Sequence, residues 1–153
     1  MFLPITKLAS IHTILMLAAC HDWDMDTFNF NSTYLNSELG EEEEIYMQEP
    51  PGFEESTGSV TWLRKSLYRL KQARRQWYDT LTCTLNNLGL CITQANLGVF
   101  CAQVEDDVLI LAVHVNNCVI MSSSSKLMCH YKQTFNARYA LTDLGPIHWL
   151  LRI

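Results

Sequence analysis

Residues 99–121 read VFCAQVEDDVLILAVHVNNCVIM, and their hydrophobic pattern decides the fold class. Two apolar runs, 99–104 and 108–115, flank a short acidic segment, which is the pattern of a β-hairpin. The second run is apolar throughout its first six residues, so it is predicted to be a central strand. Asn116 and Asn117 then separate it from a third apolar run. Because Asn tolerates positive φ, a second tight hairpin turn is predicted there.

The segments on either side of these strands have helical periodicity. Residues 6–20 carry apolar side chains at helical spacing and are predicted to form an amphipathic helix that packs on a sheet. Residues 72–88 have apolar side chains three or four positions apart and are followed by Gly89, a typical C-terminal cap. A third helix is predicted over residues 126–136, after a run of four serines.

The remaining segments complete the predicted element order. Residues 25–30 are predicted to form a strand, residues 62–68 a short strand pair, and residues 147–153 a last strand after a Gly-Pro turn. The segment 49–59 is rich in turn residues and is predicted to be a loop. Helices segregated from a largely antiparallel sheet indicate an α+β fold.

The composition is that of a globular protein. Of 153 residues, 48% are hydrophobic and 18% are charged, which suits one domain, residues 1–153, with a single core. No run of 18 apolar residues occurs, so a transmembrane helix is excluded and no membrane partner is expected. The net charge is -5, but six of the eleven basic residues lie between Arg64 and Arg75. One segment is therefore locally basic within an acidic chain.

Neither the cysteines nor the acidic residues form a recognisable metal site. The six cysteines are irregularly spaced, so they are predicted to be free, mostly buried thiols of an intracellular protein, cytoplasmic or nuclear. Residues 9–20 are similar to the apolar part of a signal peptide, but their polar start argues against secretion. The alternating acids at 22, 24 and 26 imitate a calcium-binding loop. That loop needs Gly and Glu where this sequence has Thr27 and Thr33.

Two segments are distinctive, IYMQEPPGF at 45–53 and SLYRLKQARRQWY at 66–78. With YLNSEL at 34–39 and LTDLGPI at 141–147, in this order and spacing, they resemble the reverse transcriptase of copia-type LTR retrotransposons. The resemblance covers nearly the whole chain. It implies a polymerase palm-like antiparallel sheet with helices packed on one face, here with incomplete fingers and no thumb. In that family the enzyme is one region of a longer Pol polyprotein.

Polymerase palms carry out phosphoryl transfer with two divalent ions that are held by carboxylates. The resemblance places Asn29, Asn116 and Asn117 at the three metal-binding Asp positions of the family, and His114 at the Tyr of its YVDD motif. Each Asn lacks an attraction of about 8 kcal/mol between a carboxylate and a divalent ion at an effective dielectric constant near 20, before desolvation is subtracted. Asp26 is expected to face the other side of the sheet. No catalytic residue, metal site or cofactor is therefore expected here, although the family uses Mg²⁺.

The family positions beside the incoming nucleotide are also altered. The resemblance assigns substrate contacts to Tyr34, Arg69, Lys71 and Gln72. Arg69 replaces a Gly that lets the backbone approach the ligand, so its long side chain is expected to occupy the nucleotide-binding space. Tyr34 falls at the aromatic residue that excludes a 2′ hydroxyl, and the alternative for it is a buried packing residue.

Arg64, Lys65, Arg74 and Arg75 are the candidates for nucleic-acid contact. Cations interleaved with aromatic residues are typical of surfaces that bind phosphates and stack on bases. The alternative is the solvated face of a helix and its lead-in. If the first interpretation holds, the partner is RNA or an RNA-DNA hybrid, bound weakly because the acidic first third repels a polyanion.

Three functional hypotheses follow from these residues. The favoured one is a catalytically inactive reverse transcriptase-like domain derived from a retrotransposon, because the Asn residues at 29, 96, 116 and 117 can each arise from Asp by a single G-to-A transition. This is the change that cytosine deamination leaves in a silenced element. The alternative is a co-opted nucleic-acid-binding or interaction module that uses residues 64–75. The third is an active RNA-directed DNA polymerase that is completed by partner chains.

Overall fold

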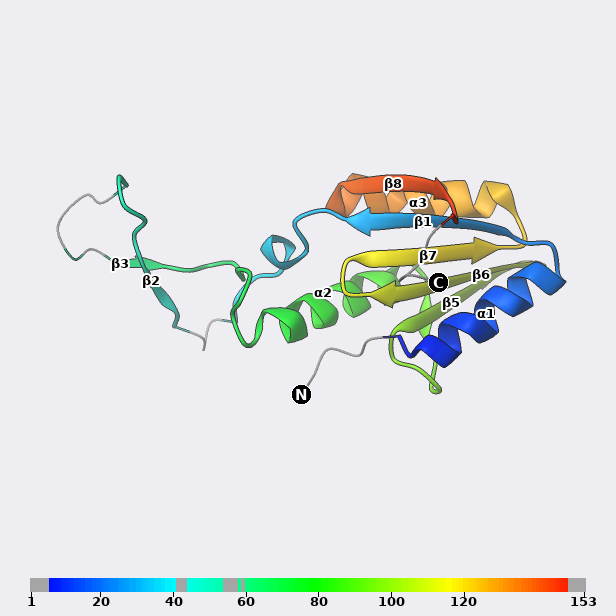
Figure 1. The fold of residues 1–153 in the computed structure, drawn as a ribbon, viewed down its shortest axis with the longest axis horizontal. Helices are drawn as coiled ribbons and strands as arrows, with labels where there is room; N and C mark the ends of the chain where they lie inside the picture. Colours follow the sequence, from blue (N-terminus) through cyan, green and yellow to red (C-terminus); the bar gives the residue numbers. More distant parts are fainter. Residues whose placement is uncertain (1–5, 41–43, 54–57, 59, 149–153) are drawn as a thin grey trace.

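A six-stranded antiparallel sheet forms the centre of the structure (Figure 1). The computed structural model describes residues 6–40, 44–53, 58 and 60–148. Across the sheet the strands follow the order β4-β5-β6-β7-β1-β8, so the first strand of the chain lies between the last two. Their bounds are Cys91–Ile92 (β4), Val99–Val104 (β5), Asp107–His114 (β6), Asn117–Ser122 (β7), Asp24–Phe30 (β1) and Leu141–Pro146 (β8).

The two predicted hairpins are confirmed, with a shift in the second turn. β6 pairs with β5 on one side and β7 on the other, so its prediction as a central strand is also confirmed. The second turn consists of Val115 and Asn116, because Asn117 already pairs with His114. The positive φ, 63°, falls on Val115 and not on an Asn as predicted. A positive φ at the first of two central residues is the pattern of a type II′ turn, and it strains a β-branched residue.

Helices cover both faces of the sheet (Figure 1). α2 (Ala73–Asn87) and α3 (Ser125–Tyr139) share one hydrophobic core with the strands, whereas α1 (Leu8–Cys20) packs on the opposite face in a second core. The prediction that the helices pack on one face is therefore wrong. The central strands β6 and β7 have buried apolar residues on both of their faces, so both faces require a cover. The second core consists of Ile11, Ala18, Val99, Ala112, Val119 and Met121.

The three predicted helices are confirmed, with small shifts at their ends. Helix α2 ends as predicted at a glycine, because Gly89 has a φ of 86°. The N–H of Gly89 donates to the carbonyl of Asn86 (3.0 Å), and that of Leu90 donates to the carbonyl of Leu85 (2.9 Å). These two hydrogen bonds are the pair that defines a Schellman motif.

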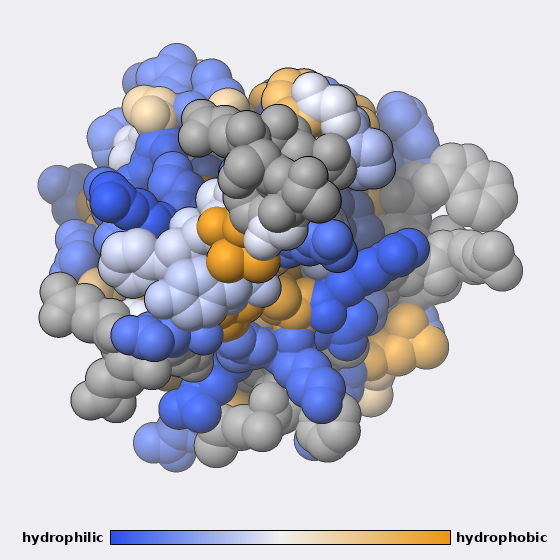
Figure 2. All heavy atoms as spheres, turned by 90° about the vertical axis from the view of Figure 1, so that its left-hand side faces the viewer, coloured by the Kyte–Doolittle hydropathy of each residue, from blue (hydrophilic) through white to orange (hydrophobic). Residues whose placement is uncertain are grey.

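Strands β2 (Tyr46–Gln48) and β3 (Val60–Trp62) form a separate two-stranded ribbon, at the left end of Figure 1. All six of its residues are exposed. Figure 2 views this end of the molecule and shows mainly hydrophilic residues, with smaller apolar areas between them. A ribbon that buries neither face lacks the alternating pattern by which strands are predicted from sequence, and β2 was not predicted.

The strand pair predicted at 62–68 is wrong, since β3 ends at Trp62 and Lys65 makes a single isolated bridge with Glu38. Strand β8 includes the Gly-Pro turn that was predicted to precede the last strand. Of the last strand, predicted at 147–153, the two described residues are not in a strand, and residues 149–153 lie outside the described part. The loop predicted at 49–59 is confirmed for its described residues.

The cysteines are free thiols, as predicted, but they are not mostly buried. Cys118 is buried in β7, Cys101 is half-buried, and the others lie on exposed surfaces of helices and the short edge strand. The reason is that four of the six occupy solvent-facing positions of elements whose apolar faces are formed by other residues. In the described part of the chain, no helix reaches the length and hydrophobicity of a membrane span.

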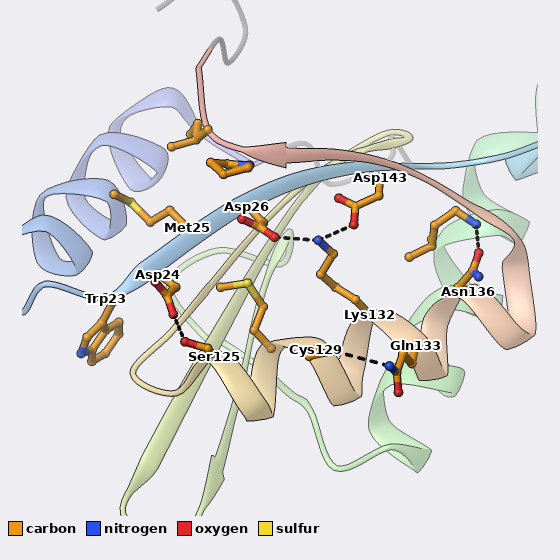
Figure 3. A pocket seen from close by; sticks show the side chains of 14 residues that line it. Trp23, Asp24, Met25, Asp26, Ser125, Cys129, Lys132, Gln133, Asn136 and Asp143 are labelled. Carbon is orange, nitrogen blue, oxygen red and sulfur yellow. Dashed lines mark hydrogen bonds and ion pairs between the residues drawn. The ribbon is translucent and has the colours of Figure 1, made fainter.

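One lysine ties α3 to the edge of the sheet (Figure 3). The Nζ atom of Lys132 lies 2.6 Å from Asp26 Oδ2 in β1 and 2.6 Å from Asp143 Oδ2 in β8. Burial acts most strongly and lowers the pKa of Lys132, but the hydrogen bonds and charges of both carboxylates outweigh it and raise the pKa. Burial likewise acts to raise the pKa of Asp143, but hydrogen bonds from Lys132 and the Gly145 N–H, with the lysine charge, lower it overall.

Lys132→Met is expected to lower the free energy of unfolding at neutral pH by about 1–2 kcal/mol, because two carboxylates then face each other without a cation. A lowered Asp pKa stabilises the fold above the ordinary value of about 4, and a raised Lys pKa stabilises it below about 10. The destabilisation should therefore be constant between these limits and should shrink as the pH falls below about 4. Urea denaturation at several pH values measures it, with the exposed Lys126→Met on the same helix as the control. Equal stability of the two variants at neutral pH would contradict the role of Lys132.

Arg69 lies in a turn that favours glycine. Its φ is 75°, and the N–H of Leu70 donates to the carbonyl of Leu67 (3.3 Å). These features place Arg69 at the third position of a type II β-turn, where the backbone is left-handed and Gly is preferred. The resemblance implies a Gly at this position, which would let the backbone approach the ligand. The left-handed turn gives a second reason for a Gly there.

Arg69→Gly is expected to raise the free energy of unfolding by about 1 kcal/mol, because it relieves the left-handed strain of a residue with a Cβ atom. Arg74→Gly removes the same charge in the first turn of α2 and should instead lower stability by up to about 1 kcal/mol. Chemical denaturation of both variants measures the two effects. Destabilisation by Arg69→Gly would show that the side chain makes contacts worth more than the strain.

Candidate functional site

The structure brings together Asn29, Asn116 and Asn117, the three residues for which the resemblance predicts metal-binding Asp positions. Asn29 in β1 is the register partner of Asn117 in β7. Asn116 precedes Asn117 in the turn between β6 and β7, and its carbonyl accepts a hydrogen bond from the N–H of Phe30 (3.0 Å). Residues from the first and last thirds of the chain therefore meet at one end of the sheet.

His114 extends this group by one strand. It pairs with Asn117, so His114, Asn117 and Asn29 form a row across β6, β7 and β1. Along β7 the side chains alternate between faces, and Asn117 falls on the same face as Val119, which packs under α1. The row therefore lies on the α1 face of the sheet.

The donor set of this row does not fit a magnesium ion. Mg²⁺ prefers anionic oxygen ligands, whereas carboxamides are neutral and an imidazole offers nitrogen. The Asn29 Oδ1 and His114 Nδ1 atoms are buried and make no hydrogen bond within the described part of the chain. No group of three or more His, Cys, Asp or Glu side chains placed to hold a metal occurs among the described residues.

The acidic residues Asp26 and Asp107 do not supply carboxylates to the row. Asp26 shares a face of β1 with Phe28, opposite Asn29, and is bound to Lys132. The prediction that it faces the other side of the sheet is confirmed. Asp107 pairs with Val104 at the far end of β6 from His114. Neither of these two carboxylates is thus directed at the row.

A cavity of about 760 Å³ lies beside the turn of Val115 and Asn116. Its walls come from the short 3-10 helix η1 (Thr33–Asn36), the loop before α2, the first turn of α2 and the turn of Val115 and Asn116. Three of the four predicted substrate-contact residues line it, namely Tyr34, Arg69 and Lys71. Gln72 is the N-terminal flanking residue of α2 and does not line it. Arg69 forms part of the wall, and the expectation that its side chain occupies nucleotide-binding space stays a prediction.

Tyr34 has the surroundings of the packing residue that was one of its two predicted roles, while its role toward a 2′ hydroxyl stays a prediction. It is buried in the main core, as a packing residue would be, and it also lines the cavity. Its ring meets that of Tyr68 edge to face, with centroids 4.8 Å apart. Tyr68 is 60% exposed, so one aromatic ring of this pair is accessible at the cavity.

The basic residues of the segment 64–75 do not form one surface. Arg64 lies over the ring of Trp62 (5.7 Å), and Lys65 lines a separate cavity with Arg138. Arg75 forms an ion pair with Asp79 in the next turn of α2 (3.6 Å). The remaining three cations, Arg69, Lys71 and Arg74, line the 760 Å³ cavity.

Val115 is a site residue that the sequence did not indicate. Its carbonyl accepts a hydrogen bond from Trp77 Nε1 (3.3 Å), which fixes the turn against α2. The left-handed φ of a Val is held by this long-range contact and by the pairing of β6 with β7. Nothing in the local sequence signals it, because β-branched residues are disfavoured in such turns.

Comparisons with known proteins identify the family of this chain. Residues 1–153 match the family model described as reverse transcriptase (RNA-dependent DNA polymerase). The chain is 34% identical over 153 residues to the retrovirus-related Pol polyprotein from transposon TNT 1-94 of Nicotiana tabacum, covering 98% of this chain and 11% of that protein. It is 29% identical to the corresponding polyprotein from transposon RE2 of Arabidopsis thaliana, covering 99% and 10%. It is also 31% identical to the putative transposon Ty5-1 protein YCL074W of Saccharomyces cerevisiae, covering 81% and 39%.

The chain thus spans about a tenth of the length of the first two of these relatives. No solved structure gives a significant match. The match of the family model over the whole sequence nevertheless decides the assignment. The chain belongs to the reverse transcriptase family, in the form found in copia-type retrotransposon Pol polyproteins.

Proposed function

We propose that this reverse transcriptase-like domain does not catalyse DNA synthesis. The observation that carries the proposal is the register pairing of Asn29 with Asn117, beside Asn116, at the place where the family has its carboxylates. When bound, the two divalent ions of a polymerase activate the primer hydroxyl and neutralise the transferred phosphate. Three neutral side chains supply no charge to hold them.

The same substitutions support retention of the fold. An Asn side chain has nearly the shape of Asp, so β1 and β7 keep their pairing and the turn keeps its contacts. Removal of carboxylates from one site also removes their mutual repulsion. The replacement of Asp by Asn would therefore account both for the loss of catalysis and for the retention of the palm-like sheet.

A primer-extension assay on a primed RNA template, with Mg²⁺ or Mn²⁺, tests the proposal. We expect no template-dependent extension by this chain. The triple variant Asn29→Asp, Asn116→Asp, Asn117→Asp should show little extension while Arg69 remains in the cavity wall, and more when Arg69→Gly is added.

Template-dependent extension by the unmodified chain would overturn the proposal. A matched control is Asn116→Ala with Asn117→Ala, which removes any remaining oxygen ligand from the turn. If the unmodified chain extends a primer and this control does not, the Asn oxygens act as ligands.

A second function, weak binding of RNA or an RNA-DNA hybrid, is favoured by the cation and aromatic contact at the ribbon. Arg64 lies over Trp62, which is 50% exposed, and such pairs can engage both a phosphate and a base. This surface is limited to Arg64 and Lys65. Of the other basic residues in the segment 64–75, Arg75 is paired with Asp79 and three line the 760 Å³ cavity.

Fluorescence anisotropy with a labelled RNA-DNA hybrid at several salt concentrations tests this second function. Binding through phosphate contacts should weaken as salt rises, with a slope of log affinity on log salt of about -0.7 to -0.9 per contact. Replacing Arg64 and Lys65 by Ala should flatten the slope by about that amount for each phosphate that is no longer neutralised. Lys126→Ala, at the end of α3 opposite to Arg138, should leave it unchanged. Absence of binding at low salt would eliminate this function and leave the first.

A further inference from the structure

We propose that Cys91 and Cys101 form a reversible disulfide that covalently links strand β4 to strand β5. The two residues are direct register partners in this antiparallel pair. Directly opposed residues of antiparallel strands have Cα atoms about 4.5–5.5 Å apart. Disulfides join residues whose Cα atoms are about 4.4–6.8 Å apart. The backbone therefore already holds the two cysteines at a bridging separation.

The two thiols also lie on the same face of the sheet. Directly opposed side chains project from one face, and side chains alternate between faces along each strand. Cys101 therefore shares a face with Val99, which packs with α1 in the second core, whereas Phe100 belongs to the main core on the other face. The thiol of Cys101 donates a weak hydrogen bond to the carbonyl of Cys91 (3.7 Å), so it is already directed toward β4.

The other four cysteines, all within the described part of the chain, do not form such a pair. Cys118 in β7 has Phe28 and Val113 as its register partners. Its complete burial raises the pKa of its thiol well above the ordinary value, which keeps it protonated and unreactive. The remaining three are exposed on three different helices, namely Cys20, Cys83 and Cys129.

The oxidant that this reaction requires is a small-molecule disulfide. Cys91 is exposed and Cys101 is half-buried, so the thiolate of Cys91 attacks first. A bond forms between Cys91 and one sulfur of the oxidant, the bond between the two oxidant sulfurs breaks, and one small thiolate leaves. The thiolate of Cys101 then attacks Cys91 Sγ and expels the second small thiolate. The two protons lost by the cysteines pass to these thiolates, so two protein thiols are oxidised and one small disulfide is reduced.

The bridge closes a ring over residues 91–101, and this ring holds the start of α1. The carbonyl of Gly98 accepts a hydrogen bond from Thr6 Oγ1 (3.0 Å), and Asn96 Nδ2 donates to Ser10 Oγ (2.9 Å). A Cβ atom at Gly98 would lie 2.5 Å from Thr6 Oγ1, so the two segments are in close contact. Oxidation should therefore stabilise the attachment of α1 as well as the two-residue edge strand β4. Because the bridge lies at an exposed edge, it should be readily reduced again.

Oxidised glutathione, applied to the folded chain, tests the proposal in a background where the three exposed helical cysteines are replaced by Ser. Free thiols are then alkylated, and the intact mass and chymotryptic peptides are measured. Chymotrypsin cuts after Leu97 and Phe100, between the two cysteines, so a bridge leaves their peptides linked. We expect the loss of two hydrogen atoms, a linked pair of peptides that contain Cys91 and Cys101, and reversal by dithiothreitol.

Two variants of this background serve as controls. Cys101→Ser should retain one glutathione on Cys91, because the second exchange step has no thiol. Cys91→Ser combined with Ile92→Cys moves the thiol by one residue and therefore to the other face of the sheet. This variant should not form the bridge. Both changes in β4 are at its exposed or half-buried positions, so the fold is expected to persist.

Thermal unfolding and hydrogen exchange measure the effect of the bridge. The melting temperature of the oxidised background should exceed that of the reduced one by about 5–10 °C, as expected for closing a short loop in a domain of this size. Amide exchange in residues 92–100 and at the start of α1 should slow several-fold.

The proposal is overturned if both thiols stay free, if glutathione remains on Cys91 while Cys101 is present, or if the linked peptides contain a different cysteine. Equal bridging by the variant with the shifted thiol also overturns it. A melting temperature that oxidation leaves unchanged would contradict the effect on β4 and α1. None of these outcomes depends on primer extension, so they leave the proposed function untouched.

Discussion

Strand β1 lies between β7 and β8, and its antiparallel pairing with β7 joins residues 24–29 to residues 117–122. This contact makes one sheet of two distant parts of the chain. It is supported by Phe30, whose ring meets those of Trp77 in α2 and Phe135 in α3 at centroid distances of 5.6 and 6.2 Å. Each such pair contributes about 0.5–1.5 kcal/mol beyond the area it buries. The same pairing sets Asn29 opposite Asn117, so the stability of the sheet and the geometry of the site depend on one register.

The neutral side chains of Asn29, Asn116 and Asn117 dominate the chemistry of the candidate site. Neutral Asn side chains keep the register but supply no attraction for a divalent ion, while Arg69 and Arg74 add positive charge to the adjacent cavity. The Lys132 contacts lie on the other face of β1 and are untouched by these changes, so the fold can persist independently of the site.

Much of the fold was predictable, because its strongest elements carry strong local signals. The apolar runs of β5, β6 and β7 and the glycine after α2 are of this kind. The ribbon of β2 and β3 was missed because neither face is buried, and the side on which α1 packs depends on a strand order that local sequence does not encode. The meeting of Asn29 with Asn117 was anticipated from the family resemblance and not from spacing. The left-handed Val115 was not predictable, since a hydrogen bond from distant Trp77 holds it.

Paramagnetic NMR with Mn²⁺ tests the central claim, that Asn29, Asn116 and Asn117 hold no divalent ion. Amide signals are recorded as Mn²⁺ is added to this chain and to the variant with Asp at all three positions. The account predicts selective broadening around these positions in the variant alone, because the carboxylates supply the charge that the ion requires. Selective broadening at these same positions in the unmodified chain would contradict it.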